Sequence, residues 1–99
     1  MDRSSRTTIL PRVLPYQTHG VPTVLRSGAY RLFFYSNEGN EPPHVHVRRE
    51  RSLAKVWLDE VALAGAIGFS DVELRAIVRL VMSNRRALLV AWEQFHGST

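Results

Sequence analysis

Two histidines spaced two residues apart, with an arginine two residues further on, are the side chains of this sequence best suited to chemistry. They lie in the segment Pro42-Pro43-His44-Val45-His46-Val47-Arg48. Residues i and i+2 of a β-strand point to the same face, so His44, His46 and Arg48 would lie together in a strand. Val45 and Val47 would then face a core, and we expect the imidazoles to be exposed. Truncating an exposed histidine to alanine should cost less than about 1 kcal/mol.

The neighbouring predicted strands add charged and aromatic side chains to the same face. The strand before the histidines adds one of two alternating sets, and we favour the first because it contains an arginine: Arg31, Phe33 and Tyr35, or Tyr30, Leu32 and Phe34. Counting by twos after the histidines adds Lys55 and Trp57. Their partners on the opposite, core-facing side would be Ala54, Val56 and Leu58.

Three interpretations of the face stay open. In the first, the face is structural, either solvated or forming a homodimer, because exposed aromatic patches often mark association.

The second interpretation is contact with RNA. Rings interleaved with basic groups on a sheet suit stacked bases and phosphates. The nucleic-acid-binding candidates are Arg31, Arg48, Lys55 and Trp57. Histidines titrate near neutral pH, so a pair of them could supply the acid and the base for phosphodiester cleavage, with an arginine stabilising the charge on phosphorus. The catalytic candidates are His44, His46, Arg48 and Tyr35. No pattern here defines a reaction, so the sequence leaves open whether the protein is an enzyme.

The third interpretation is a metal site. A His-x-His pair on a strand can fill two coordination positions of one divalent ion, such as zinc, nickel or iron, and these ligands would be His44 and His46. A third ligand is needed, and spacing alone does not identify it. The candidates are His19, Glu38, Glu41, Asp59, Glu60 and His96. Apart from such an ion, no cofactor is expected, because the chain has no glycine-rich phosphate loop.

The elements that would position this face form an antiparallel meander. Gly28 suits the positive φ of a tight hairpin turn. Pro42 and Pro43 cannot donate to a ladder, so the histidine strand should begin at His44. The predicted strands cover residues 24–26, 30–35, 44–50 and 53–58, while residues 61–66 form either a short fifth strand or an irregular link.

The last third of the chain is predicted to be helical. Ser70 and Glu73 have the spacing of a capping box, and an apolar stripe with helical spacing follows them. This pattern predicts one long helix over residues 71–95, with a kink near residues 83–84 as the open alternative. The fold class is therefore α+β: a small antiparallel β-meander of about four strands packed against a long C-terminal α-helix. Residues 1–21 are predicted to be an N-terminal arm, and residues 22–99 a single domain.

Composition narrows the class of protein. The chain has 99 residues, of which 44% are apolar and 22% charged, as in ordinary globular domains. It has no cysteine, which excludes disulfides, thiolate metal sites and a cysteine nucleophile. No apolar stretch is long enough to span a bilayer and no signal peptide is evident, so we expect a cytoplasmic protein without membrane contact. The net charge of +4 suits a phosphate-bearing partner but is modest.

Several short segments, taken in order, carry a family resemblance. They are residues 22–26, Gly28 with Tyr30-Arg31, residues 33–38, residues 43–47, residues 54–58, Gly68-Phe69-Ser70 with Glu73-Leu74, and Trp92. Together they resemble the bacterial and archaeal family catalogued as domain of unknown function 4160, from Pro22 to about His96. The resemblance implies a short cytoplasmic protein, often encoded beside a second small protein in an arrangement similar to a toxin–antitoxin pair. Family members commonly begin near Pro22, so the arm is a departure.

The residues and the resemblance together predict a small partner-dependent protein. Its function is expected to be that of a toxin-like component of a two-gene module, acting on RNA through the histidine, arginine and aromatic side chains of the sheet face. The expected partner is the product of the adjacent gene. The alternative is a non-enzymatic binding or dimerisation module, with or without a metal ion at His44 and His46.

Overall fold

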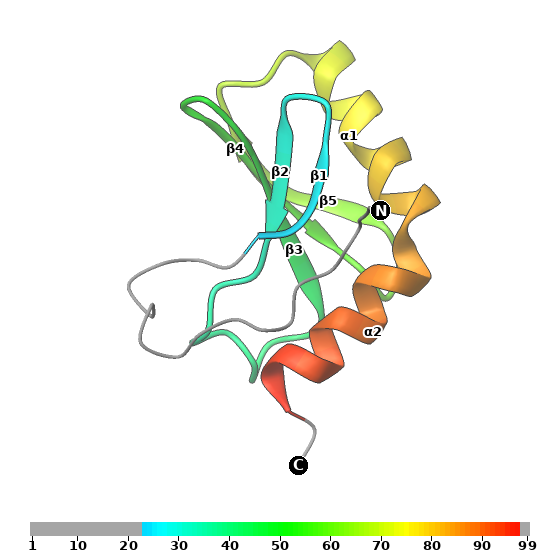
Figure 1. The fold of residues 1–99 in the computed structure, drawn as a ribbon. Coiled ribbons are helices and arrows are strands. Elements are labelled where there is room, and N and C mark those ends of the chain that lie inside the picture. The colour runs from blue at the N-terminus through cyan, green and yellow to red at the C-terminus, as the bar shows by residue number, and fades with distance from the viewer. Residues whose placement is uncertain (1–22, 98–99) are drawn as a thin grey trace, which may run out of the picture.

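Residues 23–97 are described by the computed structural model, and they form a five-stranded antiparallel sheet covered on one face by two helices (Figure 1). The strands are β1 (Thr23–Ser27), β2 (Tyr30–Phe33), β3 (His44–Arg49), β4 (Ser52–Trp57) and β5 (Ala62–Ile67), and the helices are α1 (Asp71–Ser83) and α2 (Arg85–His96). The strands pair in chain order, which makes the sheet a meander. The α+β class is confirmed, and the segment left open after β4 is a fifth strand. The predicted arm, residues 1–21, lies outside the described residues.

Local sequence explains where β2 and β3 begin. Gly28 has φ of +58°, the left-handed conformation that the turn between β1 and β2 requires. β3 begins at His44, directly after the two prolines, as their missing N–H groups predicted. The turn at Gly28 places β1 opposite β2, and the start of β3 at His44 sets which residues of that strand share a face.

The core lies between the sheet and the helices. Val45 and Val47 of β3 and Val56 of β4 are fully buried there, against Ile77 and Val81 of α1. The capping box that begins α1 is confirmed: Glu73 N–H donates to the Ser70 hydroxyl over 3.2 Å, and Ser70 N–H donates to the Glu73 carboxylate over 2.8 Å.

The single long helix predicted for residues 71–95 is divided in two, at the position where a kink was the alternative. Asn84 separates α1 from α2, with φ of −114°, and its side-chain amide donates to the Leu80 carbonyl over 2.9 Å. The Arg85 guanidinium donates to the carbonyl oxygens of Leu58 and Asp59, over 2.7 and 2.8 Å. These bonds fasten the start of α2 to the end of β4. The change of direction carries α2 across the lower end of the sheet (Figure 1), where Trp92 reaches the start of β3.

Within the described residues, no helix is both long enough and apolar enough to cross a membrane.

Candidate functional site

The register of β3 with its neighbours gathers the side chains that alternation predicted on one face. The cross-strand sets are Arg31–Arg48, Phe33–His46–Lys55 and His44–Trp57. Tyr35 follows the end of β2, and its ring centroid lies 4.6 Å from that of His46. The structure therefore places these side chains together on the face that lies away from the valines of β3.

The expectation that the two imidazoles are exposed is wrong. His44 has 0% of its surface exposed and His46 has 6%. The loop between β2 and β3 brings Glu38 against both rings, and Phe33 and Tyr35 pack against the His46 ring. The His44 ring also packs against two indoles, with centroids 5.5 Å from Trp57 and 5.0 Å from Trp92. Alternation predicts which side chains share a face, but it cannot predict that a loop and a helix end cover that face.

Glu38, which that loop carries, is the centre of the buried cluster. Its Oε1 atom lies 2.6 Å from Nε2 of His44 and 2.9 Å from Nε2 of His46. The metal-binding atoms of these three side chains all lie within 4.8 Å of one another. Glu38 was one of several candidates for the third ligand. The loop between β2 and β3 folds back toward β3 and so brings Glu38 to the two histidines.

The hydrogen bonds of His44 define where its protons lie. Nδ1 is 2.9 Å from the carbonyl oxygen of Pro42, and a carbonyl only accepts, so Nδ1 carries a proton and donates. Nε2 then faces the Glu38 carboxylate at 2.6 Å. Two lone pairs cannot face each other at this distance, so a proton or a cation must lie between Nε2 and Oε1. The geometry thus defines a position that a proton or a metal ion can occupy.

Burial and hydrogen bonding shift the pKa values of the other two members. Burial lowers the pKa of His46, and this outweighs the opposing effects of its hydrogen bond and charge interaction with Glu38. Burial alone would raise the pKa of Glu38, but hydrogen bonds from His44 and His46 reverse the direction and lower it. Near neutral pH the cluster therefore holds a neutral His46 and an ionised Glu38, the forms that coordinate metals. Nδ1 of His46 is buried without a hydrogen-bond partner in the structure.

The other candidates for the third ligand do not join Glu38, His44 and His46 in this cluster. Glu41 forms an ion pair with Lys55, over 2.9 Å, and lies 3.8 Å from Nδ1 of His44, the nitrogen that already donates to Pro42. Asp59 and Glu60 are exposed after the end of β4. His19 lies outside the described residues.

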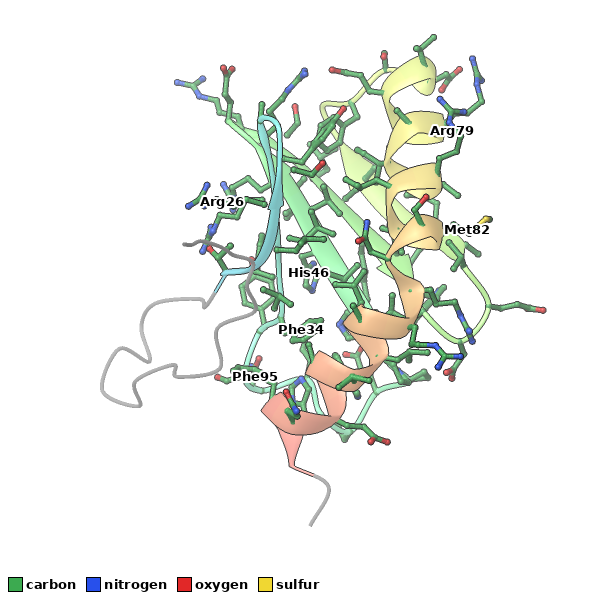
Figure 2. The ribbon with its side chains drawn as sticks, turned by 45° about the vertical axis from the view of Figure 1, so that its right-hand side comes forward. Arg26, Phe34, His46, Arg79, Met82 and Phe95 are labelled. Atoms are coloured by element: carbon green, nitrogen blue, oxygen red, sulfur yellow. The ribbon has the colours of Figure 1, made fainter. Side chains whose placement is uncertain are left out.

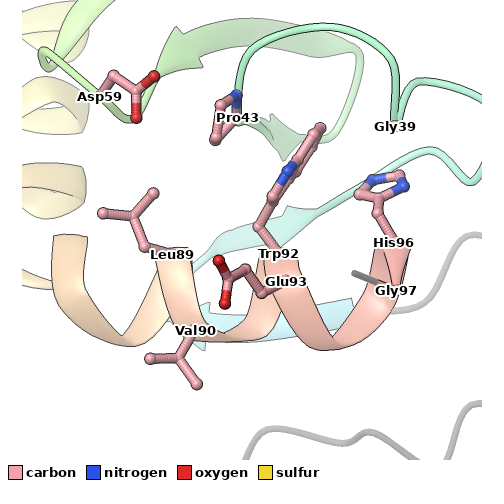
Figure 3. Close-up of a pocket in the computed structure, with 9 residues that line it drawn as sticks. All are labelled: Gly39, Pro43, Asp59, Leu89, Val90, Trp92, Glu93, His96 and Gly97. Carbon is pink, nitrogen blue, oxygen red and sulfur yellow. The ribbon is translucent and has the colours of Figure 1, made fainter. Parts of the chain in front are cut away.

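His96 lies beyond the cluster, against Trp92, with ring centroids 4.0 Å apart. Both residues line an open pocket of about 500 Å³, together with Pro43 and Gly39 (Figure 3). A Cβ atom at position 39 would lie 2.8 Å from Nδ1 of His96, which explains the glycine there. Burial lowers the pKa of His96, and the charge interaction with His44 adds to the shift. Trp92, to which the sequence analysis assigned no role at the site, contacts the rings of His44 and His96.

A row of arginines crosses the same sheet face. Arg26 lies opposite Arg31, and Arg31 lies opposite Arg48. Figure 2 shows Arg26 on the side of the sheet away from the helices. Burial lowers the pKa of Arg31, and the charges of Arg26 and Arg48 lower it further. Arg26 was missed by the sequence reasoning, although a tight turn at Gly28 implies that positions 26 and 31 face each other.

Comparisons with known proteins identify a family. A family model described as "Domain of unknown function (DUF4160)" matches residues 29–93, which is more than half of the chain. No curated protein and no solved structure matches the chain significantly. The chain therefore belongs to the DUF4160 family, as the resemblance predicted, over a shorter range than Pro22 to His96. The matched range contains Glu38, His44 and His46.

Proposed function

We propose that this member of the DUF4160 family is a metal-binding module, in which Glu38, His44 and His46 hold one divalent transition-metal ion. The observation that carries the proposal is the convergence of three ligand atoms within 4.8 Å in a largely buried site. Two imidazoles and one carboxylate are a recurring ligand set for zinc, and they also suit iron(II). Zinc is the ion we expect to bind most tightly of these two.

The surroundings of His44 support this assignment. A histidine that binds a metal usually donates its second ring N–H to a carbonyl or a carboxylate, which fixes the tautomer and the ring orientation. Nδ1 of His44 makes this bond to the Pro42 carbonyl, over 2.9 Å. When Nε2 carries no proton, its lone pair points toward Glu38 and can bind a metal ion placed between them. β3 supplies both imidazoles from one strand, and the loop supplies the carboxylate.

Metal binding requires a small expansion of the cluster. Bonds from zinc to nitrogen or oxygen measure about 2.0–2.2 Å, so neighbouring ligand atoms in a tetrahedral site lie roughly 3.3 Å apart. The corresponding distances here are 2.6 and 2.9 Å. The Glu38 side chain is 22% exposed and belongs to a loop, so it has room to move outward. An ion would then fasten the loop to β3 and keep a fourth position for water or a partner atom.

The test begins with elemental analysis of the full chain, purified without an affinity tag, and continues with zinc titration of chelator-treated protein. We expect one equivalent of bound metal and a rise in melting temperature on adding zinc. Glu38→Gln should abolish both. The matched control is Glu41→Gln, which changes a carboxylate of the same loop that pairs with Lys55 and should leave both unchanged. No stoichiometric metal, and no thermal shift with zinc, nickel or iron(II), would rule the proposal out.

The arginine row favours a second function, the binding of RNA by a toxin-like component of a two-gene module. Within residues 23–97, Arg26 and Arg48 form no ion pair with a carboxylate, whereas Arg49 on the helix side pairs with Glu73. Adjacent strands lie about 4.8 Å apart, so the row spans roughly 10 Å. Like charges placed opposite each other are unfavourable in a sheet, and a bound chain of phosphates would offset the repulsion. Because Glu38 and the covering loop occupy the two histidines, we propose binding without cleavage.

Fluorescence anisotropy with a labelled single-stranded RNA tests this second function. Arg26→Ala and Arg48→Ala should each weaken binding, and each should reduce the slope of log K against log salt by about 0.7 per lost phosphate contact. Arg86→Ala removes an exposed arginine from α2 and is the matched control. RNA affinity that is unaffected by the sheet variants, or equally affected by the control, would contradict binding at this face.

The two-gene context needs a separate experiment. We propose that the product of the adjacent gene is a partner of this protein. Expression alone and co-expression with that gene should differ in growth rate, and the two proteins should co-purify. If the lone protein neither slows growth nor co-purifies with its neighbour, the toxin–antitoxin assignment is wrong.

A further inference from the structure

β5 is an edge strand with little protection. It is the last strand of the sheet, it pairs with β4, and all six of its residues are exposed. The outward N–H and C=O groups of an edge strand are open to pairing with another strand, and natural edges are usually guarded by charged residues or proline. Residues 61–69 contain neither. A register irregularity between β4 and β5, at Lys55 and Val56, is the protection that this edge does carry.

An apolar groove lies beside this edge, between β5 and α1. Leu63, Leu74 and Val78 line it, and its volume is about 470 Å³. Leu63, which lines the groove, is 38% exposed, and Ile67, which pairs with Leu53 and belongs to the other face of β5, is 72% exposed. The edge and the groove together form one continuous surface that combines unpaired backbone groups with apolar side chains.

We infer that this surface binds a second copy of the chain, with β5 of one copy pairing antiparallel with β5 of the other. A two-fold axis perpendicular to the sheet produces this arrangement, in which the two sheets join into one. The same axis keeps both α1 helices on one side of the joined sheet and makes them antiparallel. The interface is then self-complementary in its backbone hydrogen bonds.

The charges at the rim of the groove identify a second copy as the occupant. Asp71 lies at the start of α1, and Arg75 and Arg79 follow one and two turns later, all lining the groove. Because the axis reverses the direction of α1, Asp71 of one copy approaches the arginines of the other, and the reverse contact forms at the same time. A strand from a uniformly acidic or basic partner would leave one sign of charge unmatched. This proposal does not depend on a metal ion at Glu38.

The first test measures the oligomeric state of the full chain by sedimentation and light scattering, in buffer with chelator. We expect a dimer, which Leu63→Lys and Ile67→Lys convert to a monomer. Val90→Lys is the matched control, because Val90 is a 52% exposed apolar residue of α2, away from β5, and this variant should remain a dimer. Circular dichroism checks that each variant is folded. A wild-type monomer at all concentrations, or a dimer that survives both β5 variants, would overturn the proposal.

A charge-swap experiment identifies the contact itself. Asp71→Arg and Arg79→Asp should each weaken self-association by roughly tenfold, because each places like charges opposite each other twice in the symmetric dimer. An equimolar mixture of the two variants should recover the wild-type affinity, since both contacts of the mixed dimer then join opposite charges. A mixture of Asp71→Arg with Arg75→Asp tests the alternative register, in which Asp71 of one copy lies opposite Arg75 of the other. Recovery with neither pair would show that the two copies do not meet in this way.

Discussion

The two faces of β3 are buried to a similar degree by opposite chemistry. Val45 and Val47 are 0% exposed between the sheet and the helices, where burial of apolar surface stabilises the fold directly. His44 and His46, on the other face, are buried beneath a loop and hydrogen-bonded to its Glu38. Burial of a polar ring is unfavourable unless its nitrogens are paired, and Nδ1 of His46 has no partner in the structure. The comparison indicates that the valine face serves stability, whereas the histidine face buries polar rings whose nitrogens are only partly paired.

The largest effect is expected on the histidine face. His44→Ala removes a fully buried ring, leaves a cavity beside two indoles and takes both hydrogen bonds with it. We expect a loss of about 3–4 kcal/mol in the free energy of unfolding, measured by urea denaturation. From the sequence alone, His44 is expected to be exposed, which predicts a stability loss of less than about 1 kcal/mol. A measured loss that small would mean that His44 is not buried.

The valine face should respond somewhat less. Val47→Ala deletes two methyl groups from a site that is 0% exposed, and about 2–3 kcal/mol should be lost through transfer and cavity terms. Val72→Ala, at a position 66% exposed on α1, is the control and should change stability by less than about 0.5 kcal/mol. Zinc should raise the stability of Val47→Ala but not of His44→Ala. An equal response of the two variants would show that the faces are not chemically distinct.

The carboxylates of the covering loop provide a finer comparison, made in the presence of chelator. Glu38→Ala leaves both Nε2 atoms without their acceptor, and water can replace it only in part, so we expect a loss of about 1–2 kcal/mol. Glu41→Ala breaks a partly exposed ion pair with Lys55 and should cost less than about 1 kcal/mol. Urea midpoints of both variants, measured together, check the difference. Similar losses would mean that Glu38 forms an ordinary surface contact.

Local rules were sufficient to predict most of the fold. Proline at residues 42 and 43 fixed the start of β3, glycine at residue 28 fixed a turn, and the Ser70–Glu73 capping box fixed the start of α1. The break at Asn84 was only an alternative, because it depends on bonds from Arg85 to carbonyls 26 and 27 residues away. Such long-range bonds leave no periodic signal in the sequence.

The candidate site was predicted only in part, for a related physical reason. Alternation along β3 identified which side chains would share a face, since that follows from strand geometry alone. The choice of Glu38 among six candidates depends on the path of a loop, and the burial of His44 depends on where α2 places Trp92. Both are tertiary effects, and neither has a fixed spacing in the sequence.

The smallest effect is expected where the valine face of β3 ends. Arg49, next in alternation after Val47, forms an ion pair with Glu73 in the first turn of α1. The backbone N–H of Ser70 is the main cause of the lowered pKa of Glu73, and Arg49 lowers it further, against its usual value of 4.5. A pKa that folding lowers stabilises the protein above that usual value, and the contribution disappears as pH falls through the folded pKa. Glu73→Gln should therefore lower the urea midpoint slightly at neutral pH and leave it unchanged in acid, at a pH where Glu73 is protonated. Because no member of this pair is buried, high salt should also shrink the difference, whereas it should leave the Glu38→Ala loss intact.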